Sequence, residues 1–87
     1  MTTLEQKTLN AMKERFSLEI MTSGNERIMN VLIHLDDLKF LIINKVYNHP
    51  STAYSLRSWL ARAGYIVINE DKKIAIVDID KLRELKE

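Results

Sequence analysis

The stretch SLRSWLARAGYIVINEDKKIAIVDID, residues 55–80, reads as a helix followed by two strands, and it sets the architecture of the chain. Apolar residues recur in its first part with helical spacing, at Leu56, Trp59, Leu60 and Ala63. We expect this helix to span about residues 52–63, because Pro50 in the preceding motif NHPST cannot continue an earlier helix. Gly64 then provides a residue that readily ends a helix.

Two stretches rich in β-branched residues follow the glycine, at 65–69 and 74–78, and the charged sequence EDKK separates them. This pattern predicts a two-stranded antiparallel β-hairpin. Asp80 can cap a short last helix, whose Leu82 and Leu85 return to the core.

The N-terminal part predicts a helix over about residues 4–22. Two pairs match the capping-box pattern at its start, Thr2 with Glu5 and Thr3 with Gln6. One apolar stripe runs along the helix through Leu9, Met12, Phe16 and Ile20. Gly24 follows as a natural terminator.

Residues 25–48 are the most apolar part of the chain, and Ser23 with Glu26 forms a further capping-box pair before them. Helical spacing predicts a central helix here, either continuous or divided at the acidic pair Asp36–Asp37. A strand interpretation of VLIHL and KFLII stays open, because short apolar runs fit both periods.

The length of 87 residues suits a single domain, 1–87, with an N-terminal helix over 1–24 and a core over 25–87. The expected class is α+β and mostly α: an N-terminal helical hairpin, a helix-turn-helix, a two-stranded hairpin and a short C-terminal helix. The chain has no cysteine, so disulfides and thiolate metal sites are excluded. We expect a soluble, cytoplasmic protein without membrane insertion, since acidic residues interrupt the most apolar segment and no signal-peptide pattern opens the chain.

The order of helix, helix, proline-containing turn, helix and hairpin resembles the winged-helix (winged helix-turn-helix) family of DNA-binding domains. The residues that carry the resemblance are NHPSTAYSLRSWLARAGYIVINEDKKIAIV, within about 37–78. In that family a supporting helix precedes a recognition helix, and the hairpin forms the wing. The resemblance implies binding of double-stranded DNA through the exposed face of the helix at 52–63 and through the hairpin tip. It selects as contacts Ser55, Arg57, Ser58, Arg62, Lys72 and Lys73.

The chemistry of these residues suits nucleic acid, because arginine can fork onto guanine edges or phosphates, and serine and lysine can bind phosphate oxygens. The charge gives only weak support. Residues 1–44 hold five basic and six acidic residues, and residues 45–87 hold eight and six, for a net charge of +1. Glu70 and Asp71 also place two negative charges beside the hairpin lysines.

A protein-interaction module without nucleic acid is therefore the alternative function. The chain has the style of a phage or mobile-element accessory protein that inhibits or redirects a protein partner or regulates lysis. The stripe of Leu9, Met12, Phe16 and Ile20, together with several methionines, would form a homodimer or partner interface.

An enzyme or a metal site is not expected. His34 and Asp37 are three residues apart, but a zinc site needs three or four ligands, and His49 is the only other histidine. The chain has no glycine-rich phosphate loop, no thiol nucleophile and no serine with an evident histidine partner, and no cofactor is implied.

Overall fold

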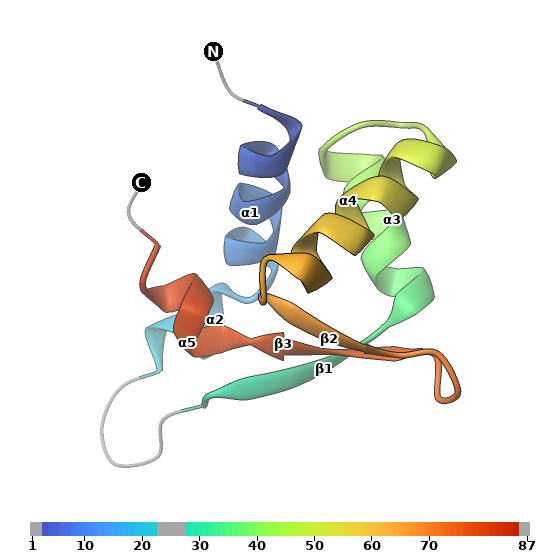
Figure 1. Cartoon of the computed structure of the whole chain (residues 1–87). Coiled ribbons are helices and arrows are strands. Elements are labelled where there is room, and N and C mark those ends of the chain that lie inside the picture. Colours follow the sequence, from blue (N-terminus) through green and yellow to red (C-terminus); the bar gives the residue numbers. More distant parts are fainter. Residues whose placement is uncertain (1–2, 23–27, 86–87) are drawn as a thin grey trace.

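The computed structural model describes residues 3–22 and 28–85. In these ranges the chain forms an α+β fold that is mostly helical, with the helices α1, α3 and α4 on one side of a three-stranded sheet (Figure 1). The elements, in chain order, are α1 (Leu4–Arg15), α2 (Ser17–Met21), β1 (Asn30–His34), α3 (Leu35–Lys45), α4 (Pro50–Arg62), β2 (Ile66–Asn69), β3 (Ile74–Asp78) and α5 (Ile79–Arg83).

The first predicted helix is present but is interrupted. Thr3 caps α1, since its hydroxyl accepts a hydrogen bond from the Gln6 amide at 3.1 Å. The continuous helix expected over 4–22 breaks at Phe16, whose side chain is buried in the core and whose backbone leaves helical geometry before α2 begins. The predicted terminator Gly24 and the capping pair Ser23 and Glu26 lie outside the described residues.

The strand β1 corrects the first part of the central helix that was predicted within residues 25–48, and with it the predicted N-terminal helical hairpin. Asn30–His34 pairs antiparallel with β3, so the sheet has three strands in the order β1–β3–β2 instead of the expected two. The physical reason is that β3 offers a free edge to a segment whose Val31 and Ile33 can face the core together. The open strand interpretation is confirmed for VLIH and is wrong for KFLII, which lies in α3.

Helix α3 begins at Leu35, directly after the strand, and its N-cap residue is His34. Asp36 and Asp37 lie in its first turn, where negative charge is favourable next to the helix N-terminus. The acidic pair therefore marks the start of a helix. This agrees with the alternative in which the predicted central helix is divided at Asp36–Asp37.

Helix α4 and the hairpin match the prediction closely. Pro50 is the first residue of α4, Gly64 has a φ of +86° just past its end, and the turn at 70–73 connects β2 and β3. Asp78, and not Asp80, caps α5 by accepting a hydrogen bond from the Lys81 amide at 3.0 Å.

The core lies between the helices and one face of the sheet. The inner face contributes Ile33, Ala75 and Val77, and the helices contribute further buried residues from α1, α3, α4 and α5. Trp59 packs against this cluster as its helical phase predicts, and its ring lies 6.0 Å from that of Tyr65. The core therefore joins the N-terminal helix to the rest of the chain.

Candidate nucleic-acid interface

Helix α4 carries four of the six predicted contacts, and they differ in how far they reach solvent. Arg62 is exposed at the C-terminal end of the helix, and Ser58 is half-buried. Ser55 is exposed, but its hydroxyl donates to the Ser51 carbonyl at 3.1 Å. Of these side chains, Arg62 is thus the cation that projects into solvent.

Arg57 lies against the hairpin instead of pointing outward. Its Nη2 donates to Oε1 of Glu70 at 3.2 Å, and its guanidinium carbon lies 4.7 Å from the centre of the Tyr54 ring. The Arg57 side chain is only 16% exposed, whereas that of Glu70 is 68% exposed. This ion pair brings the middle of α4 next to the turn between β2 and β3.

The Nε atom of Arg57 is buried and has no hydrogen-bond partner among the described residues. An unmade hydrogen bond on a buried donor costs about 1–3 kcal/mol. A pair with an exposed carboxylate contributes only about 0–1 kcal/mol. Arg57 is therefore held in place although one of its hydrogen-bond donors, Nε, has no acceptor among the described residues.

The hairpin tip has a defined backbone. The Asn69 side chain accepts a hydrogen bond from the Lys72 amide at 3.1 Å, and Lys73 adopts a positive φ of 54°. The Lys73 carbonyl accepts a hydrogen bond from the Leu35 amide at 2.9 Å, which ties the tip to the start of α3. Lys72 and Lys73 are both exposed, as predicted contacts should be, and so are Glu70 and Asp71.

A pocket of about 290 Å³ lies where α3 meets the N-terminal half of α4. Its lining residues are Leu35, Asp36, Lys39, Pro50, Ala53, Tyr54 and Arg57. Sequence reasoning did not select Lys39, Tyr54 or Glu70 for this region. Tyr54 could have been found from its spacing of three from Arg57 on a helix, whereas Lys39 and Glu70 come from other elements and join the site only through the fold.

The predicted interface stripe on α1 is not available as a surface. Leu9, Met12 and Phe16 are buried in the core, and Ile20 is half-buried against it. The prediction placed these residues at a homodimer or partner interface, and the fold uses them for internal packing because α3, α4 and α5 pack against α1.

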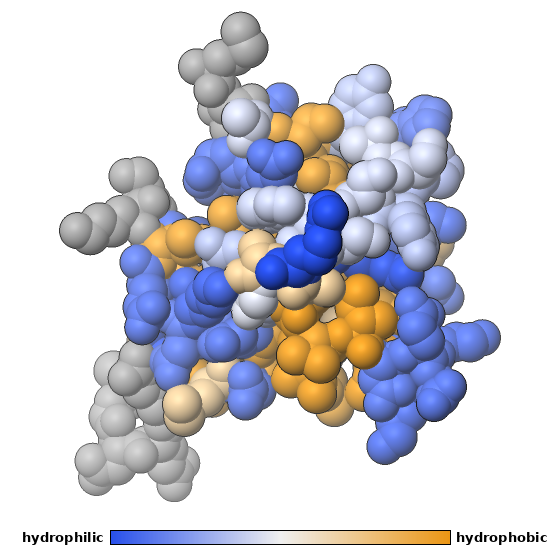
Figure 2. Space-filling model, viewed as in Figure 1, coloured by the Kyte–Doolittle hydropathy of each residue, from blue (hydrophilic) through white to orange (hydrophobic). Residues whose placement is uncertain are grey.

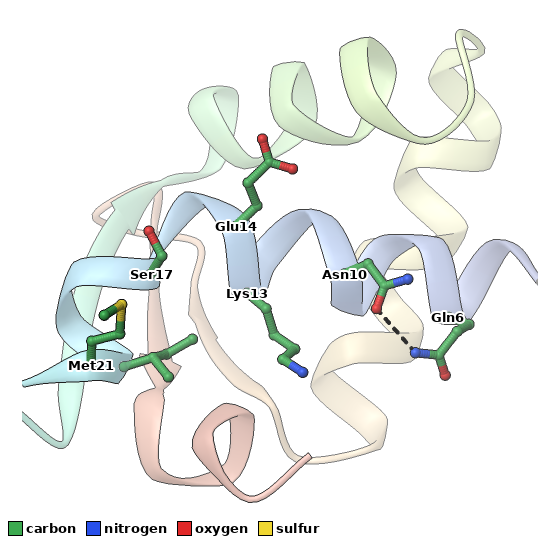
Figure 3. A pocket seen from close by; sticks show the side chains of 7 residues that line it. Gln6, Asn10, Lys13, Glu14, Ser17 and Met21 are labelled. Carbon is green, nitrogen blue, oxygen red and sulfur yellow. Dashed lines mark hydrogen bonds between the residues drawn. The ribbon is translucent and has the colours of Figure 1, made fainter. Parts of the chain in front are cut away.

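Five polar residues and two apolar residues, Ile20 and Met21, line the groove beside α1 and α2 (Figure 3). Gln6 and Asn10 bond to each other at 3.2 Å along its wall, and Lys13 donates to the Leu85 carbonyl at 3.4 Å. These contacts are internal, and the groove shows no convergent arrangement for a ligand.

The outer face of the sheet is apolar along one row. Strand register places Leu32, Ile76 and Val67 side by side across β1, β3 and β2. Leu32 is 62% exposed and Val67 is 64% exposed. In the view of Figure 2, hydrophobic surface gathers over the strands and hydrophilic surface borders it toward the hairpin tip.

In residues 3–22 and 28–85, no helix has the length and hydrophobicity needed to cross a membrane. Within the same ranges, no three histidine or acidic side chains come close enough together to hold a metal ion, and His34, Asp36 and Asp37 form no such group. Comparisons with protein-family models, with curated proteins and with solved structures gave no match for this chain.

Proposed function

We propose that this protein is a non-enzymatic, winged-helix-type regulator that acts in the cytoplasm and binds double-stranded DNA through α4 and the β2–β3 hairpin. The observation that carries the proposal is the contact between Arg57 and Glu70, which places the face of α4 beside the hairpin tip. On this proposal a single duplex contacts both Arg62 and the lysines of the tip.

The element order supports the same proposal. Strand β1 precedes α3, and the hairpin returns after α4 to pair with β1, so the two helices and the wing form one unit around a shared sheet. The backbone bond from Leu35 to Lys73 fixes the orientation of the tip relative to α3. Because the tip is already fixed, binding to the DNA backbone costs it less conformational entropy than it would cost a flexible loop.

Titration of a fluorescent duplex of about 25 base pairs against salt tests this function. We expect binding at low salt and a linear loss of log affinity with log salt concentration, because phosphate contacts release counterions. Arg62→Ala should weaken binding about tenfold and leave the thermal midpoint nearly unchanged. The matched control is Arg15→Ala, which removes an exposed arginine from α1 and should leave binding unchanged.

No binding at low salt, or binding that salt does not weaken, would contradict the proposal. A large loss of stability in Arg62→Ala would instead assign that residue to the structure of α4.

A protein-interaction module is the second candidate, and the outer row of Leu32, Ile76 and Val67 favours it. Exposed apolar side chains side by side on an uncovered sheet face are typical of interaction surfaces. In this case a protein partner or a second copy of the chain should bind the wild type and the variant Arg62→Ala equally well. The double variant Leu32→Ser, Val67→Ser should lose that partner in a pull-down and in sedimentation analysis.

A further inference from the structure

The ion pair between Arg57 and Glu70 joins two side chains with very different surroundings. Arg57 belongs to α4 and its guanidinium lies over the Tyr54 ring of the same helix. This packing holds the guanidinium in one orientation. Glu70 belongs to an exposed turn, and in residues 3–22 and 28–85 it is the one hydrogen-bonding partner of the Arg57 guanidinium. The carboxylate can therefore leave without disturbing packed side chains, whereas the guanidinium stays where it is.

The fork also has unused hydrogen-bonding capacity. One guanidinium nitrogen bonds to Glu70, and Nε has no partner in residues 3–22 and 28–85. A carboxylate and a phosphate both suit the planar donor pattern of arginine, and a phosphate offers more acceptor oxygens. A phosphate in the place of Glu70 can accept hydrogen bonds from more than one nitrogen of the exposed side of the guanidinium, because it presents several oxygens to the same donors.

The neighbouring pocket has the charge that such an exchange needs. Lys39 from α3 and Arg57 from α4 line it, and Asp36 is the one acidic residue among its lining side chains. These three charges leave one net positive charge, which Glu70 neutralises as long as it bonds to Arg57. Removal of Glu70 from the site therefore changes the site from neutral to cationic.

We infer that Arg57, Lys39 and Tyr54 form a binding site for a phosphate of the nucleic-acid backbone, and that the Glu70 carboxylate occupies this site in the free protein. The inference rests on the proposed function and deepens it. Glu70 lowers the affinity for DNA because a phosphate must displace it first. The Glu70 carboxylate thus competes with a DNA phosphate for the Arg57 guanidinium, in addition to the general repulsion between the acidic tip and DNA.

The test compares Glu70→Gln with Asp71→Asn, which removes the same charge one residue further along the turn. Asp71 is exposed, and the carboxylate that pairs with Arg57 is that of Glu70, so Asp71 reports the general electrostatic effect of the tip. Binding of both variants and of the wild type to the 25-base-pair duplex is measured by fluorescence anisotropy at several salt concentrations. Circular dichroism confirms that each variant is folded.

We expect Glu70→Gln to bind DNA about five- to tenfold more tightly, with a salt dependence steeper by about one phosphate contact. Asp71→Asn should tighten binding by less than about twofold, since a charge at an exposed position is screened by salt. The gain from Glu70→Gln should disappear in the double variant Glu70→Gln, Arg57→Met, because the phosphate then has no fork to bind. DNA binding by Glu70→Gln without binding by the wild type would support the inference as well.

Equal tightening by Glu70→Gln and Asp71→Asn would overturn the inference, since general repulsion would then explain the effect. Weaker binding by Glu70→Gln would also overturn it, because Glu70 would then position the tip. In both of these outcomes the proposed DNA binding stands. If neither the wild type nor any variant binds DNA, the inference and the proposed function fail together.

Discussion

Two half-buried arginines join distant parts of this chain, and they differ in the kind of partner that holds them. Arg83 of α5 is 18% exposed, and its guanidinium donates to the carbonyls of Ile20 at 2.8 Å, Glu19 at 2.9 Å and Ile28 at 3.1 Å. It also pairs with the carboxylate of Asp80. Arg57 of α4 has a similar exposure but is held by one carboxylate on an exposed turn.

The difference shows how one residue type can serve structure in one place and binding in another. Backbone carbonyls cannot move away from Arg83 without unfolding α2 or displacing the start of β1, so its bonds are part of the fold. The partner of Arg57 is a side chain that can rotate into solvent, so its bond can be exchanged. The fixed set of acceptors makes Arg83 a structural residue, and the exchangeable acceptor makes Arg57 suited to a ligand.

The largest expected effect is that of Arg83→Met. The methionine keeps much of the apolar stem, but the carbonyls of Ile20, Glu19 and Ile28 lose their donor, and Asp80 loses a cationic partner. We expect a loss of about 2–4 kcal/mol in the free energy of unfolding, measured by urea denaturation. A loss under about 1 kcal/mol would show that water replaces the guanidinium at little cost, and the structural assignment would be wrong.

Lys81 should give an intermediate effect. Its ammonium donates to the Ala63 carbonyl at the C-terminal end of α4 and lies 4.8 Å from the centre of the Tyr65 ring. Lys81→Met removes a cation from a helix C-terminus, and a loss of about 1 kcal/mol is expected in the same denaturation assay. The exposed Lys45 near the end of α3 provides a matched control, because Lys45→Met should change stability by less than about 0.5 kcal/mol.

Among the substitutions of Arg83, Lys81 and Arg57, Arg57→Met should have the smallest effect on stability. The variant loses an ion pair with an exposed carboxylate, but it also removes a buried Nε that has no partner among the described residues. These effects oppose each other, so we expect a change within about 1 kcal/mol. If Arg57→Met destabilised the fold as much as Arg83→Met, both arginines would be structural, and the contrast between them would be lost.

Double-mutant cycles on the two ion pairs sharpen the contrast further. The pair of Arg57 with Glu70 should show a coupling of about 0.2–1 kcal/mol, as exposed pairs do. The pair of Arg83 with Asp80 should couple more strongly, because both side chains are mostly buried. If the Arg57–Glu70 pair coupled more strongly than the Arg83–Asp80 pair, the idea that another acceptor can replace Glu70 at Arg57 would be contradicted.

Several elements could be predicted because their signals are local. Pro50 and Gly64 mark the start and end of α4 through backbone geometry alone, and the charged turn with its β-branched flanks predicts the hairpin. The mostly helical α+β class follows from these local elements. The exposed positions of Arg62, Lys72 and Lys73 also agree with the helical phase and with the turn.

Local signals failed where a segment fits two structures. The run from Asn30 to His34 has the apolar content of a buried helix, and it becomes a strand because β3 has an open edge for it. The apolar stripe of α1 was predicted to form an interface because its helical period is a local signal. The helices that pack against α1 include α4 and α5, which come from distant parts of the chain, so a local pattern could not show that they cover it.

The chain alone therefore specified the two ends of α4, the hairpin and the general class, since these depend on the conformational preferences of neighbouring residues. Only the tertiary structure decided the third strand, the burial of α1 and the partners of the two arginines. These depend on contacts between residues far apart in the chain, such as Arg57 with Glu70 and Arg83 with Ile20, and a local pattern carries no information on which distant acceptor a side chain will reach.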